Sequence, residues 1–366
     1  MKILFVSHSS VLKYHQQKLE ILAEKFGHDI TLITPPYWNE GGSSIKVYTG
    51  NGKIKYEIGK TVIFKKRLLH FYMNASDIVK KINPDIVHIE EEPFAPVCWQ
   101  FMRAAKKMHK KAVFFTWENI ERRHNPVYTY FDNYCIKKAD AAIAGNEDGK
   151  QILLKKGFKG SLEVIPQYGI NLEDFPLTAK KNDDKVSNLV YIGRLTPEKG
   201  LSTLVESLKD ISGIKLHIAG SGSALFTEIL CKQVESLGIK DKVILYPFID
   251  REKIPEFLSK MDILILPSLS TPAWKEQFGR VLIEAFAAKV AVIGSDSGEI
   301  PHIIADAGLV FREGDAHDLA SKILLLIKNP EFYASYLENG YKRVADNYTN
   351  DVISGQIDSL YKKITG

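Results

Sequence analysis

The sequence predicts an α/β protein built from two doubly wound domains. Its 366 residues exceed what one ordinary hydrophobic core accommodates. Short, nearly continuous apolar runs rich in β-branched residues alternate with helical stretches along the whole chain. Runs of this kind are typical of parallel strands that are covered on both faces. A polar, charged stretch near the middle separates two series of such runs, which favours two domains over one.

The predicted strands form two successive series. They span residues 3–6, 30–33, 86–89, 112–115, 141–144 and 162–165 in the first half, and 188–192, 215–219, 243–246, 263–266 and 290–293 in the second. The polar stretch between them is expected to be a linker at about 175–187, which gives an N-terminal domain over 1–175 and a C-terminal domain over 176–347. Ligands of doubly wound sheets lie beyond the carboxyl ends of the strands, so functional residues are expected in the loops after the strands.

The composition is that of a globular protein, with 45% hydrophobic and 25% charged residues. No apolar run approaches the ~18 residues of a membrane span. The apolar start of the chain is too short for a signal peptide, so a cytoplasmic location is expected. Cys98, Cys135 and Cys231 are few, odd in number and widely spaced, which indicates neither a disulfide framework nor a zinc site.

Positive charge is concentrated in the first half. Residues 1–180 carry 27 Lys and Arg against 19 Asp and Glu, a balance of +8, whereas the remainder carries 22 against 25, a balance of −3. The basic clusters at 65–67 and 106–111 are either solvated helix faces or a surface for an anionic acceptor or the inner face of the cell membrane. No pattern of a nucleic-acid-binding module accompanies this charge, so nucleic acid is not an expected partner.

Two basic residues and several glycines follow the first two strands of the second half. Arg194 and Lys199 stand five residues apart in a turn that begins at Gly193. Such charges suit a diphosphate, although Arg and Lys are also common on any protein surface. Gly220 and Gly222 would let backbone N–H groups approach an anion. They form only half of a dinucleotide fingerprint, because the third glycine is absent.

Two carboxylates, Glu276 and Glu284, stand on either side of Gly279 with seven residues between them. Glu284 lies in an apolar run fit for a buried helix, where an unpartnered carboxylate costs several kcal/mol or loses its charge. Gly279 is predicted to begin that helix, so that N–H groups near Phe278, Gly279 and Arg280 point into one crevice. Carboxylates suit the hydroxyls of a ribose diol and of a sugar, so the pair fits a nucleotide sugar. In the alternative, Glu284 forms a structural ion pair with a buried Arg or Lys, and Glu276 is exposed.

Four segments closely resemble the family 4 glycosyltransferases of GT-B fold, which are retaining enzymes with nucleotide-sugar donors. They are YIGRLTPEKGLSTLVESL, LHIAGSGS, DILILPS and EQFGRVLIEAFAAKVAVIGSDSGEIPHII, in family order and at family spacing. The resemblance implies two Rossmann-like domains that face a central cleft. It implies that Arg194 and Lys199 hold the diphosphate of a UDP- or GDP-sugar, and that no metal ion is required.

The resemblance also implies how the remainder of the donor is bound. Glu276 and the backbone at 278–280 would hold the transferred sugar, and Glu284 would hold the ribose. Pro247 and Phe248 would lie beside the base. The last of the four segments contains the family's Glu-x7-Glu element, which is formed here by the two glutamates.

The first half resembles the family more loosely, through MKILFVS, INPDIVHIEEEP and VIPQYGINLEDF. Many members carry a His-Asp pair after the fourth strand, where this chain has Glu118 and Asn119. Those two residues, together with His8 and His124, are the candidates for acceptor-side contacts, although a single His is more often a surface or packing residue. The acidic run 90–92 is expected to be a loop rim. The final helix, within 348–366, is expected to pack on the first domain.

The resemblance therefore implies a retaining hexosyltransferase that moves a sugar from a nucleotide diphosphate sugar to a glycan, lipid-linked or small-molecule acceptor. Two alternatives stay open. One is a nucleotide-sugar epimerase of the same fold, which needs no added acceptor, and the other is a nucleotide-sugar-binding protein without turnover. An oxidoreductase is disfavoured, because no acidic residue follows a full glycine fingerprint.

Overall fold

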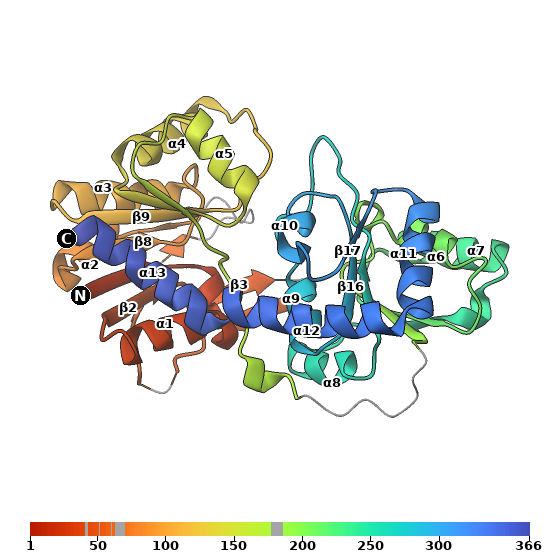
Figure 1. Cartoon of the computed structure of the whole chain (residues 1–366). Helices are drawn as coiled ribbons and strands as arrows, with labels where there is room; N and C mark the ends of the chain where they lie inside the picture. Colours follow the sequence, from red (N-terminus) through yellow and green to blue (C-terminus); the bar gives the residue numbers. More distant parts are fainter. Residues whose placement is uncertain (41–42, 51, 60, 63–69, 177–185) are drawn as a thin grey trace. The chain divides into compact units, whose positions relative to one another are not determined.

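The computed structural model describes residues 1–40, 43–50, 52–59, 61–62, 70–176 and 186–366. The chain divides into unit 1, residues 1–169 and 350–366, and unit 2, residues 170–349. Most of the expected linker and the basic cluster 65–67 lie outside the described residues. Each unit contains a parallel sheet with helices on its faces (Figure 1), which confirms the predicted α/β class with two Rossmann-like halves.

The main sheet of unit 1 has the strand order β11-β10-β9-β8-β1-β2-β5. The chain runs from β1 outward to β2 and β5 and then returns to β8 on the other side of β1, so the strand order reverses between β1 and β8. All six predicted strands are present, whereas β5 and the two hairpins were not predicted. The strands are β1 Lys2–Val6, β2 Asp29–Thr34, β5 Lys55–Ile58, β8 Ile86–Ile89, β9 Lys111–Thr116, β10 Ala141–Ala144 and β11 Ser161–Val164, with hairpins of β3 Tyr37–Glu40 and β4 Ser43–Lys46, and of β6 Thr61–Val62 and β7 Phe71–Tyr72.

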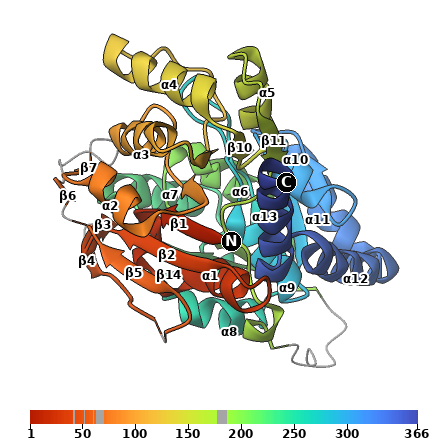
Figure 2. The ribbon, with the colours of Figure 1, turned by 90° about the vertical axis from the view of Figure 1, so that its left-hand side faces the viewer.

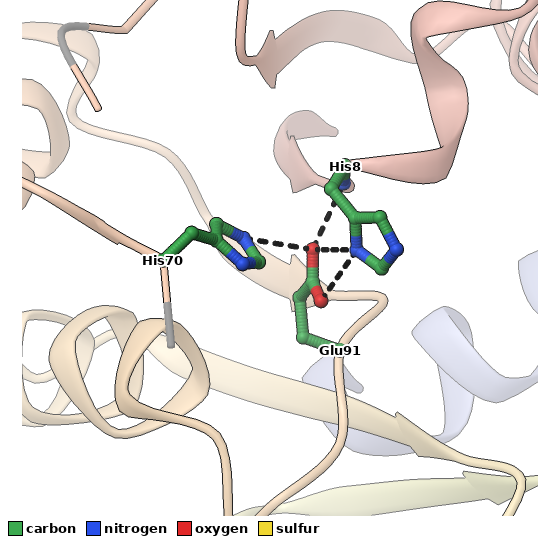
Figure 3. A group of neighbouring side chains, drawn as sticks. All are labelled: His8, His70 and Glu91. Carbon is green, nitrogen blue, oxygen red and sulfur yellow. Dashed lines mark hydrogen bonds and ion pairs between the residues drawn. The ribbon is translucent and has the colours of Figure 1, made fainter. Parts of the chain in front are cut away.

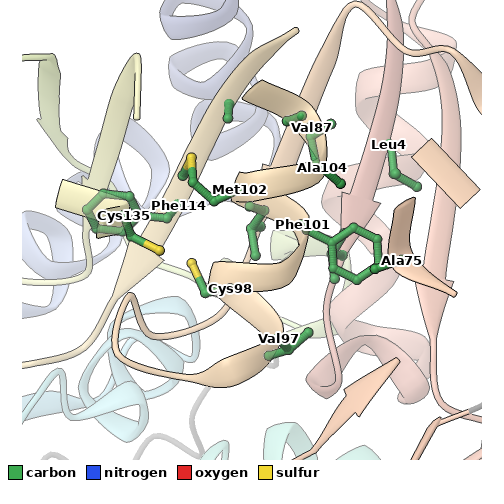
Figure 4. Close-up of a cluster of buried hydrophobic side chains, with 14 of the residues drawn as sticks. Leu4, Ala75, Val87, Val97, Cys98, Phe101, Met102, Ala104, Phe114 and Cys135 are labelled. Atoms are coloured by element: carbon green, nitrogen blue, oxygen red, sulfur yellow. The ribbon is translucent and has the colours of Figure 1, made fainter. Parts of the chain in front are cut away.

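Alternation along the strands divides the core of unit 1 between the two faces of the sheet. Leu4 and Val6 of β1 pack in the cluster that includes α2 and α3, whereas Ile3 and Phe5 pack in the cluster that includes α1 and α13. Figure 4 shows the first cluster, with Phe101 of α3 among its members. The helices of unit 1 are α1 Lys13–Glu24, α2 Ala75–Ile82, α3 Pro96–Lys107, α4 Pro126–Lys138, α5 Glu147–Lys155 and α13 Asn350–Thr365, with the 3-10 turn η1 Ser9–Val11.

The C-terminal helix α13 belongs to unit 1 and lies beside α1 (Figure 2). Ile353, Ile357 and Leu360 are buried on its inner face, at the helical spacing that places them in one stripe. Tyr361 is fully buried, and its hydroxyl is hydrogen-bonded to His88 Nδ1 of β8 at 2.6 Å. The last helix of the chain thereby covers the face of a sheet that begins at residue 2.

Unit 2 has a parallel sheet of order β14-β13-β12-β15-β16-β17, which reverses between β12 and β15. The loops after these two strands therefore lie where doubly wound sheets bind their ligands. The five predicted strands are present and β17 was not predicted. The elements are β12 Asn188–Ile192, β13 Lys215–Ala219, β14 Val243–Tyr246, β15 Ile263–Leu266, β16 Ala291–Ser295, β17 Leu309–Phe311, α6 Leu201–Ser207, α7 Ala224–Ser236, α8 Ile254–Leu258, α9 Arg280–Ala287, α10 Ile300–Ile304, α11 Ala316–Lys328 and α12 Pro330–Asn347, with the 3-10 turns η3 Leu172–Asp174, η4 Pro197–Lys199, η5 Lys240–Lys242 and η6 Arg251–Lys253.

The docking of α13 gives a stability prediction. Tyr361→Phe keeps the ring but leaves the buried His88 nitrogen without its partner, and should lower the free energy of unfolding by about 1–3 kcal/mol. Tyr361→Ala also creates a cavity and should cost about 3–5 kcal/mol. Urea titrations followed by tryptophan fluorescence measure this, because Trp38, Trp99 and Trp117 all lie in unit 1. Ser359→Ala, on the exposed side of the same helix, should leave the midpoint unchanged.

Candidate functional site

The two loops after β12 and β13 are joined through their main chains. The Gly193 N–H donates to the Ala219 carbonyl at 3.0 Å, and the Leu195 N–H donates to the Ser221 carbonyl at 2.8 Å. Gly220 adopts φ +150°, and a Cβ there would lie 1.8 Å from the Gly193 carbonyl oxygen. The sequence pattern predicted that Gly220 belongs to an anion-binding loop. In the structure, Gly220 instead packs against the backbone of the loop after β12.

Lys199 ends the 3-10 turn η4 and contacts Glu276 of the loop after β15. Its Nζ lies 2.5 Å from Glu276 Oε2, and the two side chains are only 12% and 10% exposed. The ammonium also lies 4.7 Å from the centre of the Trp274 ring, in cation–π contact. The Leu269 N–H donates to the Glu198 carbonyl at 2.8 Å and fixes one loop against the other. The structure thus brings together Lys199, which was predicted to bind the diphosphate, and Glu276, which was predicted to bind the sugar of the same donor.

Glu276 is held by side chain and main chain alike. The Ser268 hydroxyl donates to Oε2 at 2.8 Å, on the same oxygen that Lys199 contacts. The Glu276 carbonyl accepts a hydrogen bond from the Glu299 N–H at 3.1 Å. The alternative in which Glu276 is an exposed residue is therefore wrong, because its environment is a buried, polar one.

Glu284 lies on the inner side of α9, a helix that begins after Gly279 as predicted. Its Oε1 accepts from Arg280 Nε at 3.0 Å and lies 3.1 Å from Arg251 Nη2. The ion pair of the alternative interpretation is therefore present, but with two partly exposed arginines. Burial raises the pKa of the Glu284 carboxyl to about 7, against the attraction of Arg251.

The other predicted donor-side residues have contacts of their own. The Arg194 guanidinium is 63% exposed and lies 3.8 Å from Glu198 Oε1. Phe248 is exposed, and its neighbour Pro247 is half-buried in the loop after β14. Phe278 is buried, with its ring 6.0 Å from that of Tyr348. The Arg194 guanidinium therefore contacts a carboxylate of its own turn, Glu198.

Among the acceptor-side candidates in unit 1, Glu118 and His124 are neighbours. Glu118 Oε1 lies 3.5 Å from His124 Nε2, and Glu118 Oε2 accepts from Lys156 Nζ at 2.6 Å. Lys156 Nζ also lies 2.9 Å from an Asp132 oxygen. Asn119 is buried next to this group. Glu118 and Lys156 therefore belong to a largely buried ion network.

His8 lies elsewhere in unit 1, where its Nδ1 is 2.7 Å from Glu91. The expectation that the run 90–92 forms a loop rim is wrong, because Glu90 and Glu91 are 3% and 5% exposed. Glu90 instead pairs with the buried Lys18 at 2.5 Å. Both acids directly follow β8, a strand whose four residues are all buried.

Sequence reasoning missed Arg251, Ser268 and Trp274. Ser268 ends the quoted segment DILILPS and Trp274 stands two residues before Glu276. Both follow the same strand as Glu276, and this position is the signal that could have identified them. Arg251 lies 33 residues before the carboxylate that it contacts, in a polar turn that resembles any other.

Two sequence families match consecutive parts of the chain. Residues 21–173 match the family described as Glycosyltransferase Family 4, and residues 173–343 match the family described as Glycosyl transferases group 1. Together the two matches include both units and the Lys199–Glu276 pair. The chain belongs to the family 4 glycosyltransferases of GT-B fold.

This family 4 chain has similar proteins among bacteria and archaea. It is 30% identical over 216 residues to an uncharacterized glycosyltransferase of Methanocaldococcus jannaschii. That alignment covers 58% of this chain and 56% of the other protein. It is 29% identical over 208 residues to the capsular polysaccharide biosynthesis glycosyltransferase CapM of Staphylococcus aureus, which covers 53% of this chain and 52% of that protein. The chain thus spans about half the length of the curated relatives it matches.

Among solved structures, HepE of Anabaena in complex with UDP superposes on this family 4 chain with a TM-score of 0.77. The match covers 99% of this chain and 100% of HepE at 17% identity, a likeness that shows the fold alone. Within the described part of the family 4 chain, none of the helices has the length and apolar composition that a bilayer span requires.

The pKa of Glu284 gives a pH prediction for this family 4 chain. A carboxyl whose pKa rises from 4.5 to about 7 on folding contributes stability that is fully present below pH 4.5 and is lost as the pH rises through 7. Relative to Glu284→Gln, the wild type should therefore lose unfolding free energy on the order of 3 kcal/mol between pH 5 and pH 8. Thermal melts of both proteins measure the difference, with Glu256→Gln, an exposed acid on α8, as the control. The opposite trend would mean that the arginines outweigh burial.

Proposed function

We propose that this protein transfers a sugar from a nucleotide diphosphate sugar to an acceptor hydroxyl, with retention at the anomeric carbon. The observation that carries the proposal is the Lys199–Glu276 pair, a buried cation and acid at the point where the sheet order of unit 2 reverses. Membership of family 4 supports sugar transfer. The HepE structures, which contain UDP, UDP with glucose, or UDP-glucose, support a uridine diphosphate donor.

In this proposal the leaving diphosphate is stabilised by positive groups of the protein. Lys199 Nζ and the N-terminus of α9 are fixed in place. Arg194 is held only loosely, because its exposed ion pair with Glu198, at 3.8 Å, contributes little to the free energy that orders the side chain. Negative charge grows on the diphosphate as its bond to the sugar breaks, and preorganised cations stabilise that charge. These groups would supply what a metal ion supplies elsewhere, so we propose that donor binding needs none.

The carboxylates would bind the two ends of the donor. Glu276, fixed by Lys199 and Ser268, would accept hydrogen bonds from hydroxyls of the transferred sugar, so that Lys199 bridges the sugar and the diphosphate. Glu284 would accept the ribose diol while its Oε1 stays paired with the two arginines. The exposed ring of Phe248 is available to the base.

For retention, the acceptor oxygen would form its bond to the anomeric carbon on the face from which the diphosphate leaves, and the acceptor proton would pass to the diphosphate. We place the acceptor on unit 1. The basic residues 106–111 lie between the end of α3 and the start of β9, at the amino edge of the sheet and away from the edge where ligands bind, and the similarity to a capsular polysaccharide enzyme supports a glycan acceptor. The same basic surface would hold the protein at an anionic membrane.

The proposed diphosphate contacts are tested by transfer assays with UDP- and GDP-sugars. Arg194→Ala and Lys199→Ala should each reduce transfer at least ~100-fold, the scale of losing about 3 kcal/mol of transition-state stabilisation. Lys232→Ala, an exposed lysine of α7, should retain wild-type rates. The assay is run with and without added acceptor, which separates transfer from epimerisation. Wild-type rates for both site variants would remove the diphosphate assignment.

Substitutions of Glu276 and Glu284 are expected to affect different steps. Glu284→Gln should weaken binding of the nucleoside diphosphate, because it loses charge-assisted bonds to the ribose worth about 1.5–3 kcal/mol. Glu276→Gln should leave that affinity nearly unchanged and lower kcat with the full donor.

Calorimetric titration of each variant with nucleoside diphosphate, in the presence of EDTA, measures the first effect, and steady-state transfer measures the second. A melting curve for each variant shows whether the protein is folded. Equal nucleotide affinity for both variants, with a melting loss for Glu284→Gln alone, would leave Glu284 with a structural role only.

A further inference from the structure

Two imidazoles and a carboxylate from distant parts of the sequence meet in unit 1 (Figure 3). His8 follows β1, Glu91 follows β8 and His70 directly precedes β7. His8 Nδ1 lies 2.7 Å from both Glu91 oxygens, and His70 Nε2 lies 3.5 Å from Glu91 Oε1. One ligand atom from each of the three residues lies within 4.8 Å of the others.

Two of the three residues in the cluster are buried. His70 and Glu91 are buried, whereas the His8 side chain is 23% exposed, so solvent reaches the group past His8. The buried Trp38 ring lies 4.4 Å from the His8 ring and 5.0 Å from the His70 ring, measured between centroids. The His8 N–H donates to Glu91 Oε1 at 2.8 Å and orients the carboxylate. Such outer contacts are what a preformed ligand set needs.

The charge of Glu91 distinguishes it from its neighbours. Glu90 is paired with an ammonium, Lys18, and Glu92 accepts hydrogen bonds from the Thr116 hydroxyl and the Trp117 N–H. Among the described residues, Glu91 instead faces two imidazoles. A buried carboxylate that stays ionised is stabilised by a cation close by, and a metal ion would supply that cation with both imidazoles neutral.

We propose that His8, His70 and Glu91 bind a divalent transition-metal ion of the Zn²⁺ type. Two imidazole nitrogens and one carboxylate form a ligand set that suits zinc, whereas magnesium and calcium prefer oxygen ligands alone. Bond lengths of roughly 2.0–2.1 Å place tetrahedral ligands about 3.3 Å apart. The observed separations of 2.7 and 3.5 Å lie on either side of that value.

Three protein ligands leave a fourth position on the ion for water or for an oxygen of a bound molecule. The cluster lies after β1 and β8, between which the strand order of unit 1 reverses, and ligands of doubly wound sheets bind at such a point. The fourth position is therefore expected to serve a molecule bound at this edge. The metal site itself does not depend on the proposed sugar transfer.

The test is calorimetric titration of the EDTA-treated, desalted full chain with ZnCl₂, without donor or acceptor. We expect one tight Zn²⁺ per chain, no comparable heat with Mg²⁺, and visible absorption bands with Co²⁺. Loss of an outer contact typically weakens metal binding 10–100-fold, so loss of a ligand in His70→Gln or Glu91→Gln should weaken it more than ~100-fold. His302→Gln, an exposed histidine of α10 in unit 2, should bind like the wild type.

Circular dichroism and melting curves establish that each variant is folded. If His70→Gln or Glu91→Gln fails to fold, His8→Gln gives the same measurement, because the partly exposed His8 is the ligand least needed for packing. Absence of a stoichiometric site in the wild type, or unchanged Zn²⁺ affinity in the folded ligand variants, would overturn the proposal. Because no substrate is present, these results are independent of whether the chain transfers a sugar.

Discussion

The candidate donor site depends on the contact between Lys199 and Glu276. Removal of an ammonium and a carboxylate from water costs several kcal/mol for each ion, and only close pairing with further hydrogen bonds offsets that cost. The 2.5 Å contact and the hydroxyl of Ser268 provide both. The pair is neutral overall and does not by itself attract an anionic donor. The surplus positive charge comes from the two arginines that share the single carboxylate of Glu284, because Arg194 is itself paired with Glu198.

That contact in turn requires the loops to approach at backbone distance, which two glycines make possible. Gly200 directly follows Lys199 at φ +69°, and a Cβ there would lie 1.8 Å from the Pro267 carbonyl oxygen. Gly298, at φ +55°, stands in the same relation to the Glu276 carbonyl at 2.1 Å. A side chain at either position would push apart the loop segments that position Lys199 and Glu276. The contact between Lys199 and Glu276 therefore depends on glycine at the two positions where the loops meet.

Sequence reasoning found the strands of both sheet interiors, because burial on both faces makes them nearly continuous apolar runs. Of the four edge strands of the two parallel sheets it found β11 and β14 but missed β5 and β17, since Lys55–Ile58 is partly exposed and polar, and Leu309–Phe311 is only three residues long. It located Glu284 because an acid in an apolar run demands a reason, and Glu276 through its position on the other side of Gly279, with seven residues between the two acids. It did not find Arg251, because a side-chain contact across 33 residues leaves no local pattern in either partner. The His8–Glu91 contact escaped it for the same reason.

The run 90–92 shows where composition stops being informative. Three consecutive glutamates follow β8, and each has a different partner. Glu90 pairs with an ammonium, Glu91 lies against two imidazoles, and Glu92 accepts hydrogen bonds from two neutral donors. Burial raises the pKa of Glu92 to about 7, against the hydrogen bonds from Thr116 and Trp117. The partner, and not the acid, therefore decides whether each carboxylate is a structural ion, a ligand for a cation or a group that can hold a proton near neutral pH. In both units the acids follow strands at which the sheet order reverses, so the fold fixes where carboxylates gather and the opposing residue fixes what each can bind.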